Sequence, residues 1–340
     1  MTPSVLTWEI RDPGACVLQV TNMWPDPNRP VYGVFVRRQV ESLRRRGLAC
    51  DVLYLRGYLG PHAYALAAAS FARSSVSWRG RYRVIHVHAG ETALAARSHV
   101  GAPLVASYVG DDLLGDRRDD GTISPRARAR AALIRSHSLL FPATITKSQA
   151  MEAVLPAATR RRNSVIPNGV DRTLFAPLDR AEARRRLGWD AAPVALFAAT
   201  KPRSPNKRLW LAEEAARRAG VRLHVAATED PNTMPVLMSA ADCLLLTSVV
   251  EGSPNAVKEA LMCGLPVVAT PAGDVHEILA NVTPSFVCPP DPDALAVAVR
   301  ACVEGVRSNG RDEAAWLGED AIADRILAVY ERLAPGVTPR

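Results

Sequence analysis

One stretch of the chain, residues 242–277, constrains the fold more than any other part of the sequence. Residues 242–247 form a short, mostly apolar run, as expected of a strand that is buried on both faces of a parallel sheet. A turn with Pro254 follows, and the apolar spacing from Asn255 onward is that of a helix that ends at Gly264. Residues 267–268 then start a second strand. This order of elements predicts an α/β fold with a parallel sheet.

Two carboxylates give this stretch a chemical interpretation as well. Glu251 lies in the turn and Glu259 lies on the helix that follows it. The turn is expected at the carboxyl end of the sheet, where open α/β sheets bind ligands. The N-terminus of the adjacent helix favours a phosphate, because it presents backbone N–H groups and the positive end of the helix dipole. The alternative is that Glu251 caps the helix and that Glu259 is a solvated surface residue.

Three segments of this stretch, residues 251–254, 258–260 and 263–269, closely resemble the signature of family 4 of the retaining glycosyltransferases. Members of that family have the GT-B fold, an α/β architecture of two doubly wound Rossmann-like domains that face each other across a cleft. The resemblance implies that Glu251 approaches the sugar and phosphates of a nucleotide-sugar donor, and that Glu259 binds the ribose hydroxyls. It places four neighbouring residues at the same donor site: Gly252, Ser253, Pro254 and Asn255.

The lysines of the chain support a phosphate site. Of the 42 basic residues, only Lys147, Lys201, Lys207 and Lys258 are lysines. Residues 200–208 link a predicted strand (194–198) to a predicted helix (208–219), and the resemblance implies that this loop carries two cations that neutralise the leaving diphosphate. Lys207 fits the second cation, and Lys201, or else Arg203, fits the first. An ammonium is not interchangeable with a guanidinium in a tight phosphate site, although chance clustering of the lysines remains the alternative.

In the first half of the chain, residues 1–14 are expected to be irregular, and residues 16–20 form the first predicted strand. A long loop ends at Gly33, and a helix over residues 34–43 and a strand over residues 51–55 follow. The resemblance places Gly33 in the loop that lines the cleft near the donor diphosphate. A plain turn is the alternative role for this glycine.

Polar residues follow two further predicted strands of this half. His86 and His88 alternate with apolar residues in the strand 84–88, and no third metal ligand is near them in the sequence. The resemblance places His88 and residues 89–91 on the acceptor side. After the strand 103–108, Gly110 and Asp111 match the family, but Val109 stands where many relatives carry a histidine close to the reacting sugar. The alternative role for Asp111 and the aspartate after it is to cap a helix.

The length of 340 residues predicts two main domains. The expected boundaries are 15–165 for an acceptor-binding domain, 166–315 for a nucleotide-sugar-binding domain, and 316–335 for a helix that packs back on the first domain. No apolar run reaches the ~18–20 residues that span a bilayer, and the N-terminus does not resemble a signal peptide. The six cysteines form no CxxC pair, as expected of free thiols in a reducing compartment. We therefore expect a cytoplasmic protein.

The net charge of +8 is carried partly by arginines along the predicted helix 127–139. They favour either contact with an anionic membrane face or a solvated helix face, and no basic motif interleaved with aromatic residues indicates nucleic-acid binding. Asp291 and Asp293 form a DxD sequence, which is better explained as a cap of the helix 294–303 than as a metal site.

The resemblance implies transfer of a sugar, with retention of configuration, from a nucleotide diphosphate to a hydroxyl acceptor that is a glycan, a lipid-linked glycan or a small molecule. Glu251, Lys201 and Lys207 are the predicted catalytic residues, and we expect neither a metal nor another cofactor. Two alternatives remain open at this point: a degenerate nucleotide-sugar-binding protein and a nucleotide-sugar epimerase of the same fold.

Overall fold

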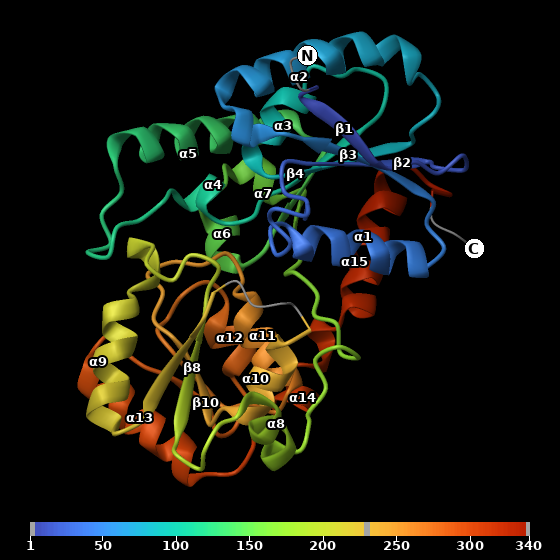
Figure 1. The fold of residues 1–340 in the computed structure, drawn as a ribbon. Helices are drawn as coiled ribbons and strands as arrows, with labels where there is room; N and C mark the ends of the chain where they lie inside the picture. Colours follow the sequence, from blue (N-terminus) through green and yellow to red (C-terminus); the bar gives the residue numbers. More distant parts are fainter. Residues whose placement is uncertain (1–3, 228–231, 338–340) are drawn as a thin grey trace. The chain divides into compact units, whose positions relative to one another are not determined.

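The computed structural model describes residues 4–227 and 232–337 and divides the chain into two compact units (Figure 1). Unit 1 comprises Met1–Gly115, Pro125–Gly169 and Glu319–Arg340, and unit 2 comprises Asp116–Ser124 and Val170–Gly318. Each unit contains one β-sheet with helices packed on it, which confirms the predicted α/β class. None of the helices in the described residues is both long and apolar enough to span a bilayer.

The sheet of unit 1 has seven strands in the order β1-β3-β2-β4-β5-β6-β7. Neighbouring strands are parallel except for β1, which pairs with β3 in the antiparallel direction. The prediction that residues 1–14 are irregular is therefore wrong, because Leu6–Ile10 forms an edge strand. The strands are β1 Leu6–Ile10, β2 Val17–Thr21, β3 Cys50–Leu55, β4 Val84–His88, β5 Leu104–Ser107, β6 Ala143–Thr146 and β7 Asn163–Val165.

Helices cover both faces of this sheet. On one face, Val36 of α1 and Ile326 and Tyr330 of α15 pack with strand residues such as Val17 and Val84, and Figure 1 shows α1 and α15 side by side. Residues of α2 and α3 pack on the other face. The helices of unit 1 are α1 Val34–Arg45, η1 Gly57–Leu59, α2 Pro61–Ser77, α3 Gly90–Ala96, α4 Asp111–Leu114, α5 Pro125–His137, η2 Ser138–Leu140, α6 Gln149–Ala153, α7 Ala157–Arg160 and α15 Glu319–Leu333.

The sheet of unit 2 has five parallel strands in the order β12-β11-β10-β8-β9. The strands are β8 Val194–Ala198, β9 Arg222–Ala226, β10 Cys243–Leu246, β11 Val267–Ala269 and β12 Phe286–Val287. Two separate apolar clusters lie against this sheet, one formed with α10, α11 and α12 and the other with α9 and α13. The helices are α8 Arg180–Leu187, η3 Pro205–Lys207, α9 Leu209–Ala219, α10 Met234–Ala240, α11 Asn255–Met262, α12 Val275–Leu279, α13 Pro292–Glu304, α14 Gly310–Glu313 and η4 Ala315–Leu317.

The stretch that was most informative in the sequence folds as predicted. Residues 242–247 contain β10, and α11 begins at Asn255, directly after Pro254. Gly264 follows the helix with a left-handed φ of 67°, which a residue without a Cβ adopts at little cost. The first aspartate of the DxD sequence, Asp291, caps a helix. Its Oδ1 accepts hydrogen bonds from the backbone N–H groups of Asp293 and Ala294.

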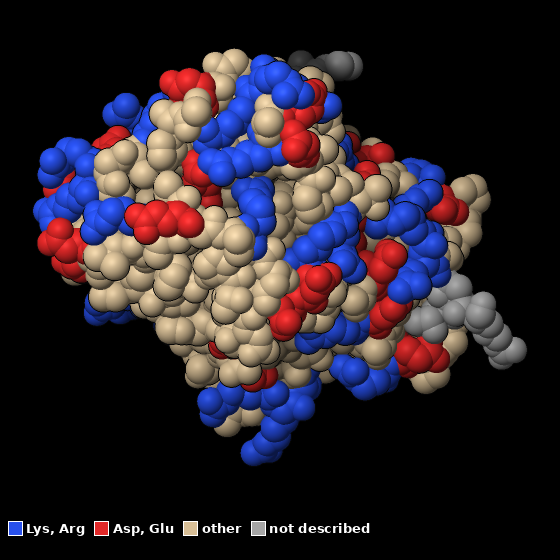
Figure 2. Space-filling model, turned by 90° about the horizontal axis from the view of Figure 1, so that it is seen from below, with Lys and Arg blue, Asp and Glu red and all other residues tan. Residues whose placement is uncertain are grey.

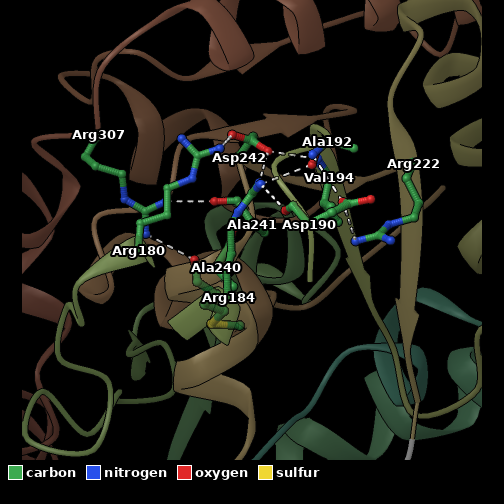
Figure 3. A network of polar contacts seen from close by, with 11 residues as sticks. Arg180, Arg184, Asp190, Ala192, Val194, Arg222, Ala240, Ala241, Asp242 and Arg307 are labelled. Atoms are coloured by element: carbon green, nitrogen blue, oxygen red, sulfur yellow. Dashed lines mark hydrogen bonds and ion pairs between the residues drawn. The ribbon is translucent and has the colours of Figure 1, made fainter. Parts of the chain in front are cut away.

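A buried ion-pair network lies at the amino ends of β8 and β10 (Figure 3). Asp242 is 5% exposed, and its Oδ2 accepts hydrogen bonds from Arg184 Nη2 at 2.9 Å and from the N–H of Val194 at 2.8 Å. Arg180 contacts the other carboxylate oxygen, and Arg184 Nε also donates to the carbonyl of Ala240. These arginines hold the ends of buried elements together, so we assign them a structural role.

Other basic side chains are paired at the surface. On the face shown in Figure 2, groups of basic side chains have acidic side chains beside them. In unit 2, for example, Glu182 of α8 pairs with Arg186 at 2.9 Å, and Glu214 of α9 pairs with Arg217 and Arg218 at 2.8 and 2.7 Å. Solvent screens exposed pairs of this kind, so they affect local charge more than stability.

Candidate functional site

The strand order of unit 2 reverses between β8 and β10. The chain runs from β8 outward to β9 and then returns to the other side of β8 as β10. Two loops therefore leave the carboxyl ends of adjacent strands in opposite directions: residues 199–208 after β8, and residues 247–254 after β10. Such a topological switch point opens a crevice that binds ligands in open α/β sheets.

The two loops bring a cation and a carboxylate together at this edge of the sheet. The ammonium of Lys207, the last residue of η3, contacts Glu251 Oε1, and both side chains are partly buried, with exposed fractions of 26% and 16%. Lys201 is exposed on the same loop as Lys207. The structure thus unites two of the three predicted catalytic side chains at the carboxyl edge of the sheet.

Hydrogen bonds to backbone groups fix the relative position of these loops. The side-chain amide of Asn206 donates to the carbonyl of Val250 at 2.9 Å and accepts from its N–H at 3.1 Å. Thr247 Oγ1 lies 2.8 Å from the carbonyl oxygen of Lys207, to which it donates. Because the residues that precede Lys207 and Glu251 are held in this way, the pair lies between two loops of fixed relative position.

The first turn of α11 lies at the same edge of the sheet, directly after the turn that carries Glu251. Pro254 precedes the helix and provides no side-chain cap, and the first turn contains no acidic residue. The turn residues Gly252, Ser253 and Pro254 are buried, whereas Asn255 and Glu259 are partly exposed. An N-terminus of this kind attracts an anion. The predicted nucleotide-sugar residues of unit 2 therefore lie along one turn and the helix that follows it.

In unit 1 the strand order reverses between β2 and β4. The loop after β2 leads to Gly33, which precedes α1 with a φ of 76°. A Cβ at this position would lie 2.3 Å from the carbonyl carbon of Met23. Gly33 is therefore required by a close approach of two backbone segments, and its predicted proximity to a donor diphosphate stays a prediction.

The two histidines of β4 are buried in a hydrogen-bonded network. His86 lies 2.5 Å from the hydroxyl of Tyr330 through Nδ1 and 2.7 Å from Ser107 Oγ through Nε2. His88 Nε2 lies 3.0 Å from Gln19 Oε1, and the His88 side chain is 1% exposed. Burial lowers the pKa of His88 to about 3, with a smaller contribution from a nearby lysine, so this imidazole is neutral at physiological pH. The predicted acceptor-side role of His88 is not tested by these contacts.

Among the side chains described, no three histidine, cysteine, aspartate or glutamate residues are grouped so that they could hold a metal ion.

The turn after β5 is organised by Asp112, a residue that the sequence indicated only as a helix cap. Its buried carboxylate accepts hydrogen bonds from the N–H groups of Gly90, Val109, Gly110 and Leu113 at 2.9–3.2 Å. Burial raises the pKa of Asp112 to about 7, with the acidic neighbours adding to this rise and the backbone N–H groups opposing it. Asp112 thus ties the loop after β4 to the loop after β5.

Asp111 faces solvent and is linked to Glu91 through an arginine. Its side chain is 52% exposed, and its Oδ2 lies 3.4 Å from Arg130 Nη2. Arg130 Nη1 lies 2.9 Å from Glu91 Oε1. Glu91 lines an open pocket of about 350 Å³ between α2 and α3, together with Pro61, Tyr64, Ala68, Leu94 and Ala95. The pocket is mostly apolar, with the Glu91 carboxylate at its wall.

Sequence reasoning missed the residues that hold the site in place. Asn206, Thr247 and Asp112 bind backbone groups across loops, and single-sequence patterns carry no signal for such contacts. Lys258 is the exception. It is completely buried on α11, and its identity as one of four lysines among 42 basic residues was a signal that it differs from the surface arginines.

Comparisons with known proteins agree with this arrangement. Residues 194–305 match the family described as Glycosyl transferases group 1. A D-inositol 3-phosphate glycosyltransferase from Catenulispora acidiphila is 29% identical over an alignment covering 76% of this chain and 74% of the relative. Sucrose-phosphate synthase from Thermosynechococcus elongatus superposes with a TM-score of 0.72 at 18% identity, covering 93% of this chain and 98% of that protein. HepE of Anabaena, solved with UDP-glucose, superposes with a TM-score of 0.62 at 18% identity, covering 94% and 98%.

These findings define the class of the protein as a glycosyltransferase with the GT-B fold. The chain contains a Glycosyl transferases group 1 domain within unit 2, which includes both loops described above, and it is a homologue of the GT-B-type glycosyltransferases.

Proposed function

We propose that this protein is a retaining glycosyltransferase of family 4 that transfers a sugar from a nucleoside diphosphate to a hydroxyl acceptor without a divalent metal. The observation that carries the proposal is the Lys207–Glu251 pair at the switch point of unit 2, which joins the loop after β8 to the turn that precedes α11. A catalytic cation and a carboxylate beside a helix N-terminus match the charges that such a reaction develops.

The residues have distinct proposed roles. Glu259, on the first turns of α11, binds the ribose hydroxyls, and residues 252–255 bind the phosphates through backbone N–H groups. Lys207 and Lys201 stabilise the charge that develops on the leaving diphosphate. These fixed donors supply the neutralisation that a bound Mg²⁺ supplies in other enzymes, which is our reason for proposing metal-independent transfer.

Retention of configuration is proposed to follow from attack on the same face of the sugar that the diphosphate leaves. The acceptor hydroxyl then transfers its proton to the departing diphosphate, the anomeric carbon–oxygen bond to the phosphate breaks, and the new glycosidic bond forms. Glu251 is proposed to approach the sugar and to hold Lys207 in position through their contact.

Unit 1 is proposed to provide the acceptor side. Gly110, Asp111 and the loop after His88 lie at the carboxyl edge of its sheet, and the pocket at Glu91 is a candidate subsite. The name of the Catenulispora relative includes a phosphorylated inositol, so a small polyhydroxylated molecule is a reasonable first acceptor to test. We propose a cytoplasmic location, and we propose peripheral contact with an anionic membrane only if the acceptor is lipid-linked.

The test is turnover of nucleotide sugars with and without acceptors. UDP-glucose is the first donor, because the Anabaena homologue was solved with it, and GDP-mannose and UDP-N-acetylglucosamine complete a short panel. Release of nucleoside diphosphate that depends on an acceptor, with the glycosidic oxygen still axial and the anomeric proton therefore equatorial in the product of an axially linked donor, supports the proposal. Binding without turnover of any donor indicates a degenerate binding protein, and conversion of the donor sugar without an acceptor indicates an epimerase.

A further inference from the structure

Three segments of unit 2 meet behind the donor turn through a buried hydrogen-bond chain. Lys258 on α11 donates from Nζ to Ser253 Oγ at 3.0 Å, and Ser253 Oγ donates to Asp274 Oδ2 at 2.6 Å. Ser253 belongs to the turn, and Asp274 directly precedes α12. The exposed fractions are 0% for Lys258, 6% for Asp274 and 8% for Ser253, so the chain is shielded from water along its whole length.

A lysine and an aspartate at this depth stabilise each other. Burial lowers the pKa of Lys258 to about 8, while the carboxylates of Asp274, Glu259 and Glu251 oppose this shift. Burial raises the pKa of Asp274, and Lys258 opposes that change. Removing water from two charges costs more than an isolated pair returns unless further hydrogen bonds are made. An apolar pair would fill the same space without this cost, so the charges require another explanation.

The hydroxyl between the two charges has only one favourable orientation. It must accept from the ammonium and donate to the carboxylate, because an ammonium only donates and a carboxylate only accepts. This arrangement fixes the χ1 angle of Ser253 and holds the backbone of the turn against α11. An apolar side chain at any of the three positions would fill the space without fixing this direction.

The loop before α12 also touches the backbone of the turn. Gly273 has a φ of 64°, and a Cβ there would lie 3.0 Å from the carbonyl oxygen of Glu251 and 3.1 Å from that of Gly252. The contact is direct backbone packing on the residues that precede Ser253. The hydrogen-bond chain therefore connects the turn, the helix and the following loop at the same place where these backbones meet.

We propose that Lys258, Ser253 and Asp274 form a charged clamp, a set of positioning residues that holds the turn of residues 251–254 in the shape that binds the donor diphosphate. The identity of the ligand rests on the proposed function, whereas the ordering of the turn does not. The clamp predicts that removing both charges leaves the fold intact but loosens the turn. A purely structural ion pair predicts that the turn keeps its order once stability is restored.

The experiment separates these roles with a double replacement, Lys258→Met with Asp274→Leu. Each single replacement leaves one buried charge and lowers the melting temperature, and the double replacement recovers most of that loss. Amide hydrogen exchange at Glu251, Gly252 and Ser253 is then compared with that of the wild type, and the dissociation constants of UDP, GDP and ADP are measured by calorimetry. A matched control is Arg184→Met with Asp242→Leu, which removes a buried ion pair at the opposite edge of the same sheet.

The clamp predicts faster exchange in the turn of the Lys258/Asp274 double variant. It also predicts at least about tenfold weaker binding of the nucleotide that the wild type binds best, the scale of one hydrogen bond to a charged group. The control variant keeps the wild-type exchange rate in the turn. If the double variant does not fold, Ser253→Ala replaces it, and the same increase in exchange is expected.

Wild-type exchange rates in the turn of the folded variants would overturn the clamp. Unchanged nucleotide affinity in the double variant, with faster exchange, would overturn its role in donor binding. If the wild type binds none of the three nucleotides but the turn loosens in the double variant, the clamp is supported as a device that orders the turn, and the proposed function fails on its own.

Discussion

Replacing Asp112 with asparagine tests whether one buried carboxylate organises the loops after β4 and β5 of unit 1. Asp112 Oδ1 accepts from Gly110 and Leu113 at 3.0 and 2.9 Å, and Oδ2 accepts from Gly90 at 3.0 Å. The N–H of Val109 is shared between both oxygens at 3.2 and 3.1 Å. An asparagine offers one acceptor and turns an NH₂ group toward the remaining donors. One or two buried N–H groups then lose their partner.

The cost follows from these contacts. A buried donor without an acceptor costs about 1–3 kcal/mol, so Asp112→Asn is expected to lower the unfolding free energy by about 2–4 kcal/mol. Urea denaturation at pH 8.5 is the suitable assay, since burial raises the pKa of Asp112 to about 7 and the carboxylate is ionised at that pH. The control is Asp111→Asn, at a side chain that is 52% exposed, with an expected change within about 0.5 kcal/mol. Equal effects of the two replacements would refute the reasoning, as would unchanged amide exchange at Gly90.

Three further predictions concern a buried ion pair, the proposed ribose contact and a buried imidazole. Asp242→Ala leaves the buried guanidinium of Arg184 without its carboxylate, so thermal or urea unfolding should show a loss of about 3–5 kcal/mol in the free energy of unfolding. The control Asp190→Ala, at an exposed carboxylate, should lower it by less than about 1 kcal/mol. Similar losses in the two variants would contradict the assigned structural role. Glu259→Ala should weaken nucleoside diphosphate binding by about 1.5–3 kcal/mol in calorimetry with little change in melting temperature, and wild-type affinity would exclude its ribose contact. Because burial lowers the pKa of His88 to about 3, the folded protein binds fewer protons than the unfolded chain below the ordinary pKa of about 6.5. The stability from this group is therefore fully present above that pH, and the free energy of unfolding falls toward pH 3 by up to about 1.4 kcal/mol per pH unit. His88→Gln should reduce this slope, and an unchanged slope would mean that the imidazole is already charged in the folded protein.

The sequence predicted those parts of the fold in which local signals agree with one another. In residues 242–264 the apolar strand, the proline before the helix, the helical spacing and the final glycine all indicate the same element order, and β10 and α11 lie where they were expected. The sequence also assigned Lys207 and Glu251 to one donor site at the carboxyl ends of the strands, whereas their direct contact was found only in the structure.

The remaining features depend on contacts that no local pattern encodes. Leu6–Ile10 is a five-residue edge strand whose partner lies far along the chain, so its half-buried alternation was too short to distinguish from a loop. Asp111 and Asp112 are adjacent and chemically identical, yet only the second is buried, because the turn directs their side chains differently. Lys258 was placed on the correct helix, but helical spacing alone does not show that a lysine is fully buried.

The measurement that tests the central claim most directly is donor turnover in excess EDTA by the wild type and by variants of Lys207. Fixed charges lie at the carboxyl ends of β8 and β10, in particular the Lys207 ammonium beside Glu251. Lys207→Ala should therefore lower kcat/KM by about 10²–10³, the scale of losing one preorganised donor that stabilises developing charge. Lys207→Arg should recover only part of this loss, because a planar guanidinium does not occupy the position of an ammonium, and Arg217→Ala on the exposed surface of α9 should have no effect.

In this account the wild type retains its full rate of transfer in EDTA, and the loss in Lys207→Ala is the same whether Mg²⁺ is present or absent. Complete inactivation of the wild type by EDTA, reversed by Mg²⁺ or Mn²⁺, would contradict it.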